Sequence, residues 1–146
     1  MKITLKQIET DQDIASSYDI MKQLRSGIDQ DDYINYINKM RSHQKQYTLI
    51  VAFSEDTKPI GLVGFSYDFR LSVKGKMIYI EDLVVDQNHQ NLGIGKKLMN
   101  YAEDIAKKQK INVLVLDSAI HRKAAHKLYE ELNFINTSNN YKKFIT

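Results

Sequence analysis

The chain has 146 residues, of which 42% are apolar and 27% are charged, and its formal net charge is +3. This composition excludes a disordered chain and a coiled coil, and the small net charge does not indicate nucleic-acid binding. The absence of cysteine excludes disulfides, thiolate zinc sites, iron–sulfur clusters and a cysteine nucleophile. The length is typical of one domain, so we expect residues 1–146 to form a single soluble unit.

The first forty residues predict one strand and two helices. Alternating apolar residues over 3–8 predict the strand. Asp11 or Asp13 is expected to cap a first helix that runs to about Arg25, and Asp29 is expected to cap a second one, where apolar residues recur at helical spacing. This region is acidic, because residues 9–39 hold seven acids and three bases.

The middle of the chain predicts three antiparallel strands. Residues 47–53 and 60–67 are strand-like and are separated by a turn that contains the only proline, so they are expected to form a hairpin. Residues 74–76 contain a glycine and turn the chain into a third strand over 77–85.

The second half predicts alternating helices and strands. A helix begins near Gly93, and residues 111–116 are apolar on both faces, which is typical of a central parallel strand reached through a helix. A last helix is expected over about 121–132, followed by short strands around Phe134 and over 141–145. Residues 86–146 hold ten bases and six acids, so this half is basic.

A glycine-containing turn lies between the third of these strands and the following helix. Glycines at 93 and 95 let a ligand approach the backbone closely, and the helix that starts there presents free N–H groups together with Lys96 and Lys97. The turn lacks the third glycine of a dinucleotide fingerprint and the first glycine and hydroxyl of a P-loop. It is therefore either an anion site of another kind or a tight turn without a ligand.

Two motifs carry a resemblance to a known family. Gln90-x-x-Gly93-x-Gly95, after the strand Tyr79 to Val85, resembles the acyl-coenzyme A motif of the GNAT superfamily of N-acetyltransferases. The block from Ala125 to Phe134 resembles the last helix of that superfamily, with Asn133 in place of a glycine and Arg122 in place of a frequent asparagine. Asn133 can adopt the left-handed conformation that the glycine provides.

The resemblance implies the fold and the coenzyme. The fold class is α/β (α+β), with a mixed, mainly antiparallel sheet of about six to seven strands flanked by about four helices. Acetyl-CoA is the implied co-substrate, and no metal is expected. The implied coenzyme contacts are made by the strand end and the turn, with one further residue: Leu83, Val84, Val85, Gln90, Asn91, Leu92, Gly93, Ile94, Gly95, Lys96 and Arg122. A backbone N–H near Leu83 or Val84 is the implied oxyanion donor.

The resemblance also implies catalytic residues. Tyr129 matches the general acid that protonates the leaving thiolate; otherwise it is a core aromatic residue. The general base is a carboxylate, for which Glu81, Asp117 and Asp82 are candidates in that order. Strict alternation along the strand places Glu81 on the same face as Leu83 and Asp82 on the opposite face. Each of these carboxylates is equally compatible with a structural role.

The expected function is the transfer of an acetyl group to a small-molecule amine by direct attack in a ternary complex. The alternatives are a protein or peptide N-acetyltransferase, a non-catalytic acyl-CoA sensor and a small nucleic-acid module. In the fold that the resemblance implies, the helical pair over 11–43 covers the acceptor site. Its acids and tyrosines favour a cationic or amino-sugar-like acceptor: Asp29, Asp31, Asp32, Tyr33 and Tyr36. We expect a cytoplasmic location and no nucleic-acid or membrane partner, and a homodimer is compatible with this interpretation.

Overall fold

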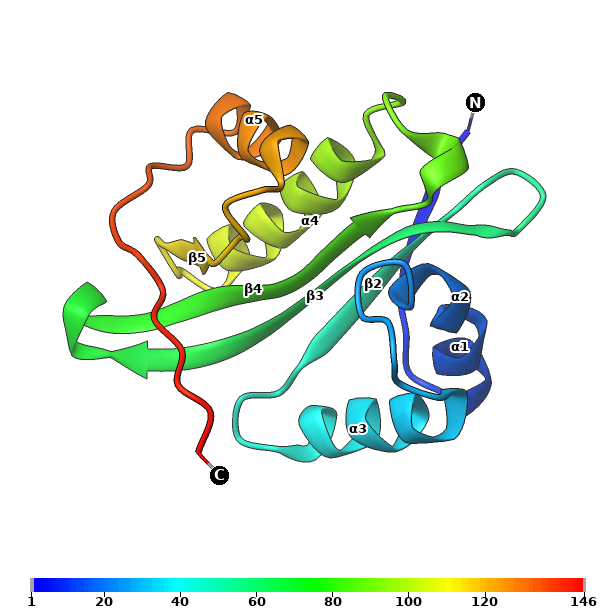
Figure 1. Cartoon of the computed structure of the whole chain (residues 1–146), viewed down its shortest axis with the longest axis horizontal. Coiled ribbons are helices and arrows are strands. Elements are labelled where there is room, and N and C mark those ends of the chain that lie inside the picture. Colours follow the sequence, from blue (N-terminus) through cyan, green and yellow to red (C-terminus); the bar gives the residue numbers. More distant parts are fainter. Residues whose placement is uncertain (1, 146) are drawn as a thin grey trace. The chain divides into compact units, whose positions relative to one another are not determined.

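The computed structural model describes residues 2–145, which form two compact units, one that ends at Leu116 and one that starts at Asp117 (Figure 1). The strands of the first unit are β1 Thr4–Gln7, β2 Thr48–Phe53, β3 Pro59–Arg70, β4 Gly75–Val85 and β5 Leu114–Leu116. Its helices are α1 Asp11–Ser16, α2 Tyr18–Met21, α3 Gln30–Ser42 and α4 Ile94–Lys108, with 3₁₀ turns η1 Leu71–Val73 and η2 Gln87–His89. The second unit contains α5 Lys123–Glu131. That the whole chain is one domain stays a prediction.

The strands form one sheet in the order β1-β2-β3-β4-β5. Pairing is antiparallel from β1 to β4 and parallel between β4 and β5, so the mixed, mainly antiparallel sheet is confirmed. The chain passes from β4 to β5 through α4, as a parallel connection requires. In the described residues β5 is an edge strand rather than the central strand that was expected.

The expected numbers of elements are wrong. Residues 2–145 contain five strands and five α-helices instead of six to seven strands and four helices. In this described part no strand forms around Phe134 or over 141–145. Phe134 is half-buried against Tyr129, whereas the apolar side chains that follow it are exposed, with Ile135 at 82% and Tyr141 at 90%, and so provide no buried face for a strand pair.

The predicted helix over 11–25 is divided into α1 and α2 at Ser17. The buried Ser17 hydroxyl donates to the Ile14 carbonyl oxygen at 2.7 Å and lies 2.8 Å from the buried hydroxyl of Tyr33. A serine that bonds back to the helix backbone competes with the regular helical pattern. Neither Asp11 nor Asp13 is the N-cap of α1, because the Thr10 side chain is the cap and accepts from the Asp13 N–H. Asp29 is confirmed as the N-cap of α3.

The two faces of the sheet pack against different helices (Figure 1). On one face Leu49 and Leu62 belong to a buried cluster with residues of α1, α2 and α3. On the other face Gly61 lies against Ile94 and Leu98 of α4. Because successive strand residues point to opposite faces, β3 is buried on both sides and is the centre of the core.

In the second unit, α5 ends as the sequence predicts. Asn133 has a left-handed conformation, with φ 68°. The Phe134 N–H donates to the Tyr129 carbonyl oxygen at 2.9 Å, and the Asn133 N–H donates to that of Glu130 at 3.0 Å. The rings of Tyr129 and Phe134 pack with centroids 5.8 Å apart. This is a Schellman motif with its apolar contact, and it sets where Tyr129 lies in the unit.

Gly64 in β3 is expected not to tolerate a side chain. A Cβ atom there would overlap the ring of Tyr47, which is buried and whose hydroxyl donates to Asp82. Gly64→Ala is therefore expected to lower the free energy of unfolding by about 2–4 kcal/mol, through overpacking and a lost buried hydrogen bond. Chemical denaturation measures this change. The matched control is Gly75→Ala, because nothing lies within 4 Å of a Cβ atom at that position, and equal effects at both positions would contradict the explanation.

Candidate active site

Strand β4 contains a bulge at Glu81. On the neighbouring strand β3, Phe65 pairs with Ile80 and Gly64 pairs with Asp82, so Glu81 has no partner residue. An extra residue in one strand shifts the alternation of the side chains beyond it. Glu81 and Asp82 therefore lie on the same face of the sheet, toward α1–α3. The predicted alternation, with Asp82 on the opposite face from Glu81, is wrong for this reason.

Both carboxylate oxygens of the buried Asp82 have donors. Oδ1 accepts from Arg25 Nε at 2.8 Å, and Oδ2 accepts from the Tyr47 hydroxyl at 2.6 Å. Burial, reinforced by the negative charge of Asp82, raises the pKa of Tyr47 well above its ordinary value, so this hydroxyl stays protonated and continues to donate. Both oxygens of this carboxylate are therefore engaged within the protein, and removal of either donor would leave a buried charge less well paired.

Glu81 is in a different environment. Its side chain is half-buried, and this burial is the main reason that its pKa is raised. A hydrogen bond with Ser66 and the positive charges of Lys45 and Arg25 lower the pKa, while the charge of Asp82 raises it further. Arg25 contacts Glu81 through the main chain, because its Nη2 donates to the Glu81 carbonyl oxygen at 2.7 Å. A half-buried carboxylate with a raised pKa has the properties of a general base.

Beyond the bulge, β4 is paired along one edge only. Residues 83–85 lie opposite residues 61–63 of β3. On the other edge, pairing with β5 ends where Ile80 meets Leu116. In the described part of the chain, the main-chain groups of Leu83–Val85 on that edge therefore have no strand partner. Such groups can bond an extended ligand in the way that an added strand would.

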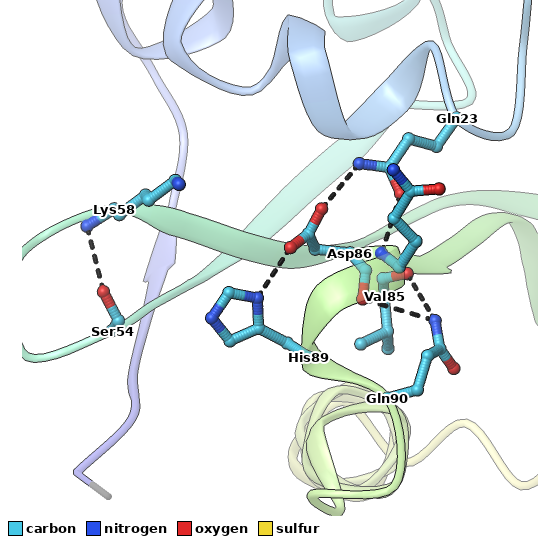
Figure 2. Close-up of polar contacts among 8 residues, drawn as sticks. Gln23, Ser54, Lys58, Val85, Asp86, His89 and Gln90 are labelled. Carbon is cyan, nitrogen blue, oxygen red and sulfur yellow. Dashed lines mark hydrogen bonds and ion pairs between the residues drawn. The ribbon is translucent and has the colours of Figure 1, made fainter.

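The turn that follows β4 is held by a carboxylate, as Figure 2 shows. The buried Asp86 accepts from Gln23 Nε2 at 2.7 Å and lies 2.6 Å from Nδ1 of His89. Gln23 also accepts from the Gln87 N–H at 3.0 Å. The hydrogen bond from Gln23, followed by the contact with His89, holds the pKa of Asp86 below its usual value. The segment after α2 thus fixes the start of the glycine-containing turn.

The glycine-containing turn has the backbone shape that the sequence suggests. Gln90 Nε2 donates to the Val85 carbonyl oxygen at 2.8 Å and closes the turn on the end of β4 (Figure 2). Asn91 and Gly93 have left-handed conformations, with φ 62° and 77°, and α4 begins directly after them. Gly93 provides no side-chain cap, so the first N–H groups of α4 are available to an anion. The exposed residues of the turn are Gln90, Asn91, Leu92, Gly93 and Lys96, and the buried ones are Ile94 and Gly95.

Three expected site residues lie in the second unit. Tyr129 is 8% exposed, and burial raises its pKa, with the positive charge of Arg122 acting in the opposite direction. Asp117 is exposed and accepts from Asn140 Nδ2 at 3.3 Å. The first unit holds Glu81, the unpaired edge and the glycine-containing turn.

The structure identifies polar residues that the sequence analysis missed. Gln23 and Arg25 follow α2 but contact β4 or the turn after it, more than 50 positions away in the chain, and no local pattern predicts such contacts. Tyr47 was interpreted only as a strand residue. Asp86 offered a signal, because a carboxylate directly after an apolar strand often forms such bonds. Among residues 2–145 no cluster of histidine and acidic side chains is placed to hold a metal ion, and no helix could span a membrane.

Sequence comparison identifies one family. The model of the Acetyltransferase (GNAT) family matches residues 12–134. The chain is 33% identical over 130 residues to the Uncharacterized N-acetyltransferase YhdJ of Bacillus subtilis (strain 168), and the match covers 88% of this chain and 89% of that protein.

Solved structures share the fold. The chain matches glucosamine-6-phosphate N-acetyltransferase from Arabidopsis thaliana with a TM-score of 0.80 and 20% identity, over 100% of both chains. It matches the aminoglycoside N-acetyltransferase AAC(6')-Iy in complex with CoA with a TM-score of 0.84 and 16% identity, over 97% of this chain and 95% of that chain. At these identities the likeness concerns the fold alone.

Asp86→Asn is expected to lower the free energy of unfolding by about 1–2 kcal/mol at pH 7, because two hydrogen bonds lose a charged acceptor. The folded-state pKa of Asp86 is lowered, so its stabilisation is present above the ordinary carboxyl pKa and is lost as the pH falls through the folded-state value. The difference from the unsubstituted protein should therefore shrink in acid. Urea unfolding at several pH values measures it. Asn88→Ala, in the same turn, is the control, and a difference that did not change with pH would contradict the explanation.

Proposed function

The chain belongs to the Acetyltransferase (GNAT) family, and on this premise we propose that it transfers an acetyl group from acetyl-CoA to the amine of a small molecule. The amine attacks directly, in a complex that holds both substrates. The observation that carries this proposal is the bulge in β4, which presents the Glu81 carboxylate next to a strand edge that β5 leaves unpaired.

The residues of the first unit suit the coenzyme. Acetyl-CoA supplies an activated acetyl thioester, an extended arm with amide groups and a pyrophosphate. The unpaired edge at Leu83–Val85 can bond the amides, and a main-chain N–H near Leu83 or Val84 is the proposed donor to the thioester carbonyl oxygen. The N–H groups of 90–96 and the Lys96 side chain suit the pyrophosphate. Arg122 is proposed as a further coenzyme contact.

Glu81 is the proposed general base. An amine is mostly protonated at neutral pH and must lose a proton before it can attack, directly or through water. Asp82 is already bonded through both oxygens to Arg25 and Tyr47, whereas Glu81 contacts Arg25 through its main chain and its side chain bonds Ser66. Asp117 stays the alternative base.

Tyr129 is the proposed general acid. Its hydroxyl donates a proton to the sulfur of the leaving coenzyme A thiolate. Burial raises the pKa of this hydroxyl, which keeps it protonated before transfer. The fixed end of α5 supports its position within the second unit, because the main-chain carbonyl of Tyr129 takes part in the Schellman motif.

A small cationic amine is the proposed acceptor. Of the acidic and aromatic residues expected to line the acceptor site, Asp31, Asp32 and Tyr36 are exposed on α3. Tyr33 is buried against Ser17 and is not available, and Asp29 is engaged as the helix cap. Support also comes from the structural neighbours, whose names give aminoglycosides and glucosamine-6-phosphate as their substrates.

The purified protein is expected to release free coenzyme A thiol from acetyl-CoA only when a suitable amine is added, in a thiol-release assay over a panel of amino sugars, polyamines and peptides. Tyr129→Phe should lower kcat about 10²-fold or more, because a general acid is lost, and should leave acetyl-CoA affinity nearly unchanged. Acetyl-CoA binding without turnover on any amine would indicate a sensor instead. Transfer to peptides alone would overturn the small-molecule acceptor, and equal kcat in Tyr129→Phe would remove this residue from the mechanism.

The pH profile tests the base. Activity is expected to fall in acid as Glu81 becomes protonated, with the fall centred above the ordinary glutamate pKa because burial raises the pKa of this group. Glu81→Gln should lower kcat/KM about 10²-fold and abolish this acid limb. Steady-state kinetics with one acceptor across pH measures both effects. Asp117→Asn is the matched comparison, and loss of the limb in that variant alone would make Asp117 the base.

A further inference from the structure

The short segment after α2 contacts the end of β4 at two points. Gln23 bonds Asp86 and the Gln87 N–H beyond the strand, and Arg25 bonds Glu81 and Asp82 at the bulge. The first contact supports the glycine-containing turn, as Figure 2 shows, whereas the second reaches the residues of the proposed base. Gln23 therefore holds the glycine-containing turn, and Arg25 holds the bulge.

The Arg25 guanidinium spans two consecutive residues of the bulge. Its Nε lies 2.8 Å from Asp82 Oδ1, and its Nη2 lies 2.7 Å from the Glu81 carbonyl oxygen. A planar guanidinium presents these donors in a fixed fork, so it holds the carboxylate and the carbonyl in one relative orientation. The bulged residue has no partner residue on β3, and its carbonyl oxygen accepts from Arg25.

Asp82 gives this contact a rigid support. Its second oxygen accepts from Tyr47, whose ring lies in the space left by the missing side chain of Gly64. The Asp82 side chain is 10% exposed and that of Arg25 is 49% exposed, so the buried carboxylate is the fixed partner of the ion pair. The buried Asp82 therefore restrains Arg25, and Arg25 restrains the peptide group after Glu81.

We propose that Arg25 is a positioning residue for the base: it holds the peptide group of Glu81 in the bulge and so aims the Glu81 carboxylate at the acceptor amine. This inference rests on the proposed function. Without the two bonds, the bulged peptide can rotate and carry the Glu81 side chain with it. A displacement of about 1 Å at a reacting group is enough to lower a rate about 10²-fold.

The charges that act on Glu81 come from several elements. Asp82 is its neighbour on β4, Arg25 follows α2, and Lys45 precedes β2, while the Ser66 hydroxyl of β3 and the Tyr47 hydroxyl lie on the same face. Loss of the Arg25 charge removes one group that lowers the pKa of Glu81 and leaves the negative charge of Asp82 without its ion-pair partner. The pKa of Glu81 therefore rises further. The acid limb of the pH profile should then move to higher pH.

The test compares Arg25→Gln, Arg25→Lys and the control Lys22→Ala by steady-state kinetics across pH. Arg25→Gln is expected to lower kcat about 10–100-fold and to move the acid limb to higher pH, with the KM for acetyl-CoA within about twofold of the unsubstituted value. Arg25→Lys keeps the charge but cannot bridge both acceptors, so kcat should fall while the limb stays in place. Lys22→Ala removes an equal charge from an exposed side chain and should change neither quantity.

The following results would overturn the inference. An unchanged kcat and acid limb in Arg25→Gln, with the loss of the limb in Glu81→Gln intact, would refute positioning by Arg25 and leave the proposed function standing. A loss in Arg25→Gln that equally affects kcat and the KM for acetyl-CoA, with a matching fall in thermal stability, would make Arg25 a purely structural residue. Release of coenzyme A thiol by the unsubstituted protein that did not depend on an added amine would instead refute the proposed function, and this inference with it. If Arg25→Gln does not fold, the kcat of Arg25→Lys decides, since an unchanged value there contradicts the bridging role.

Discussion

The extra residue in β4 is the constraint on which the described site depends. Because β3 offers one fewer residue at this point, Glu81 has no partner residue and Asp82 faces the same side of the sheet. Two neighbouring carboxylates on one apolar face would be unfavourable without compensating groups. The protein compensates Asp82 by burying it between Arg25 and Tyr47, and leaves Glu81 half-buried with a hydrogen bond to Ser66. Two residues of the same charge type therefore lie in different environments.

The bulge also separates the two uses of β4. Directly before it, residues 78–80 are paired on both edges, with β3 and with β5. After it, β5 has ended, and the edge at Leu83–Val85, which has no strand partner, leads through η2 into the glycine-containing turn. The polar contacts of Gln23 and Arg25 stabilise both ends of this stretch from a single short segment.

Local patterns in the sequence were sufficient for most of the elements. The hairpin of β2 and β3, the long helix that begins after Gly93 and the left-handed Asn133 all follow from turn residues and periodicity over a few positions. Among the predictions that were wrong are the two C-terminal strands and the alternation beyond Glu81. A strand needs a partner and a buried face, and a bulge is defined by the neighbouring strand, so neither can be derived from one segment alone.

The sequence by itself determined the class of the protein: the spacing of Gln90, Gly93 and Gly95, together with the block that ends at Phe134, places the chain among GNAT acetyltransferases, as the family match shows. It also named the carboxylates from which a base could be chosen. Only the tertiary structure distinguished Glu81 from Asp82 and brought Arg25 and Gln23 to β4. The physical reason is that a carboxylate's role depends on its burial and its donors, and these donors come from residues more than thirty positions away in the chain.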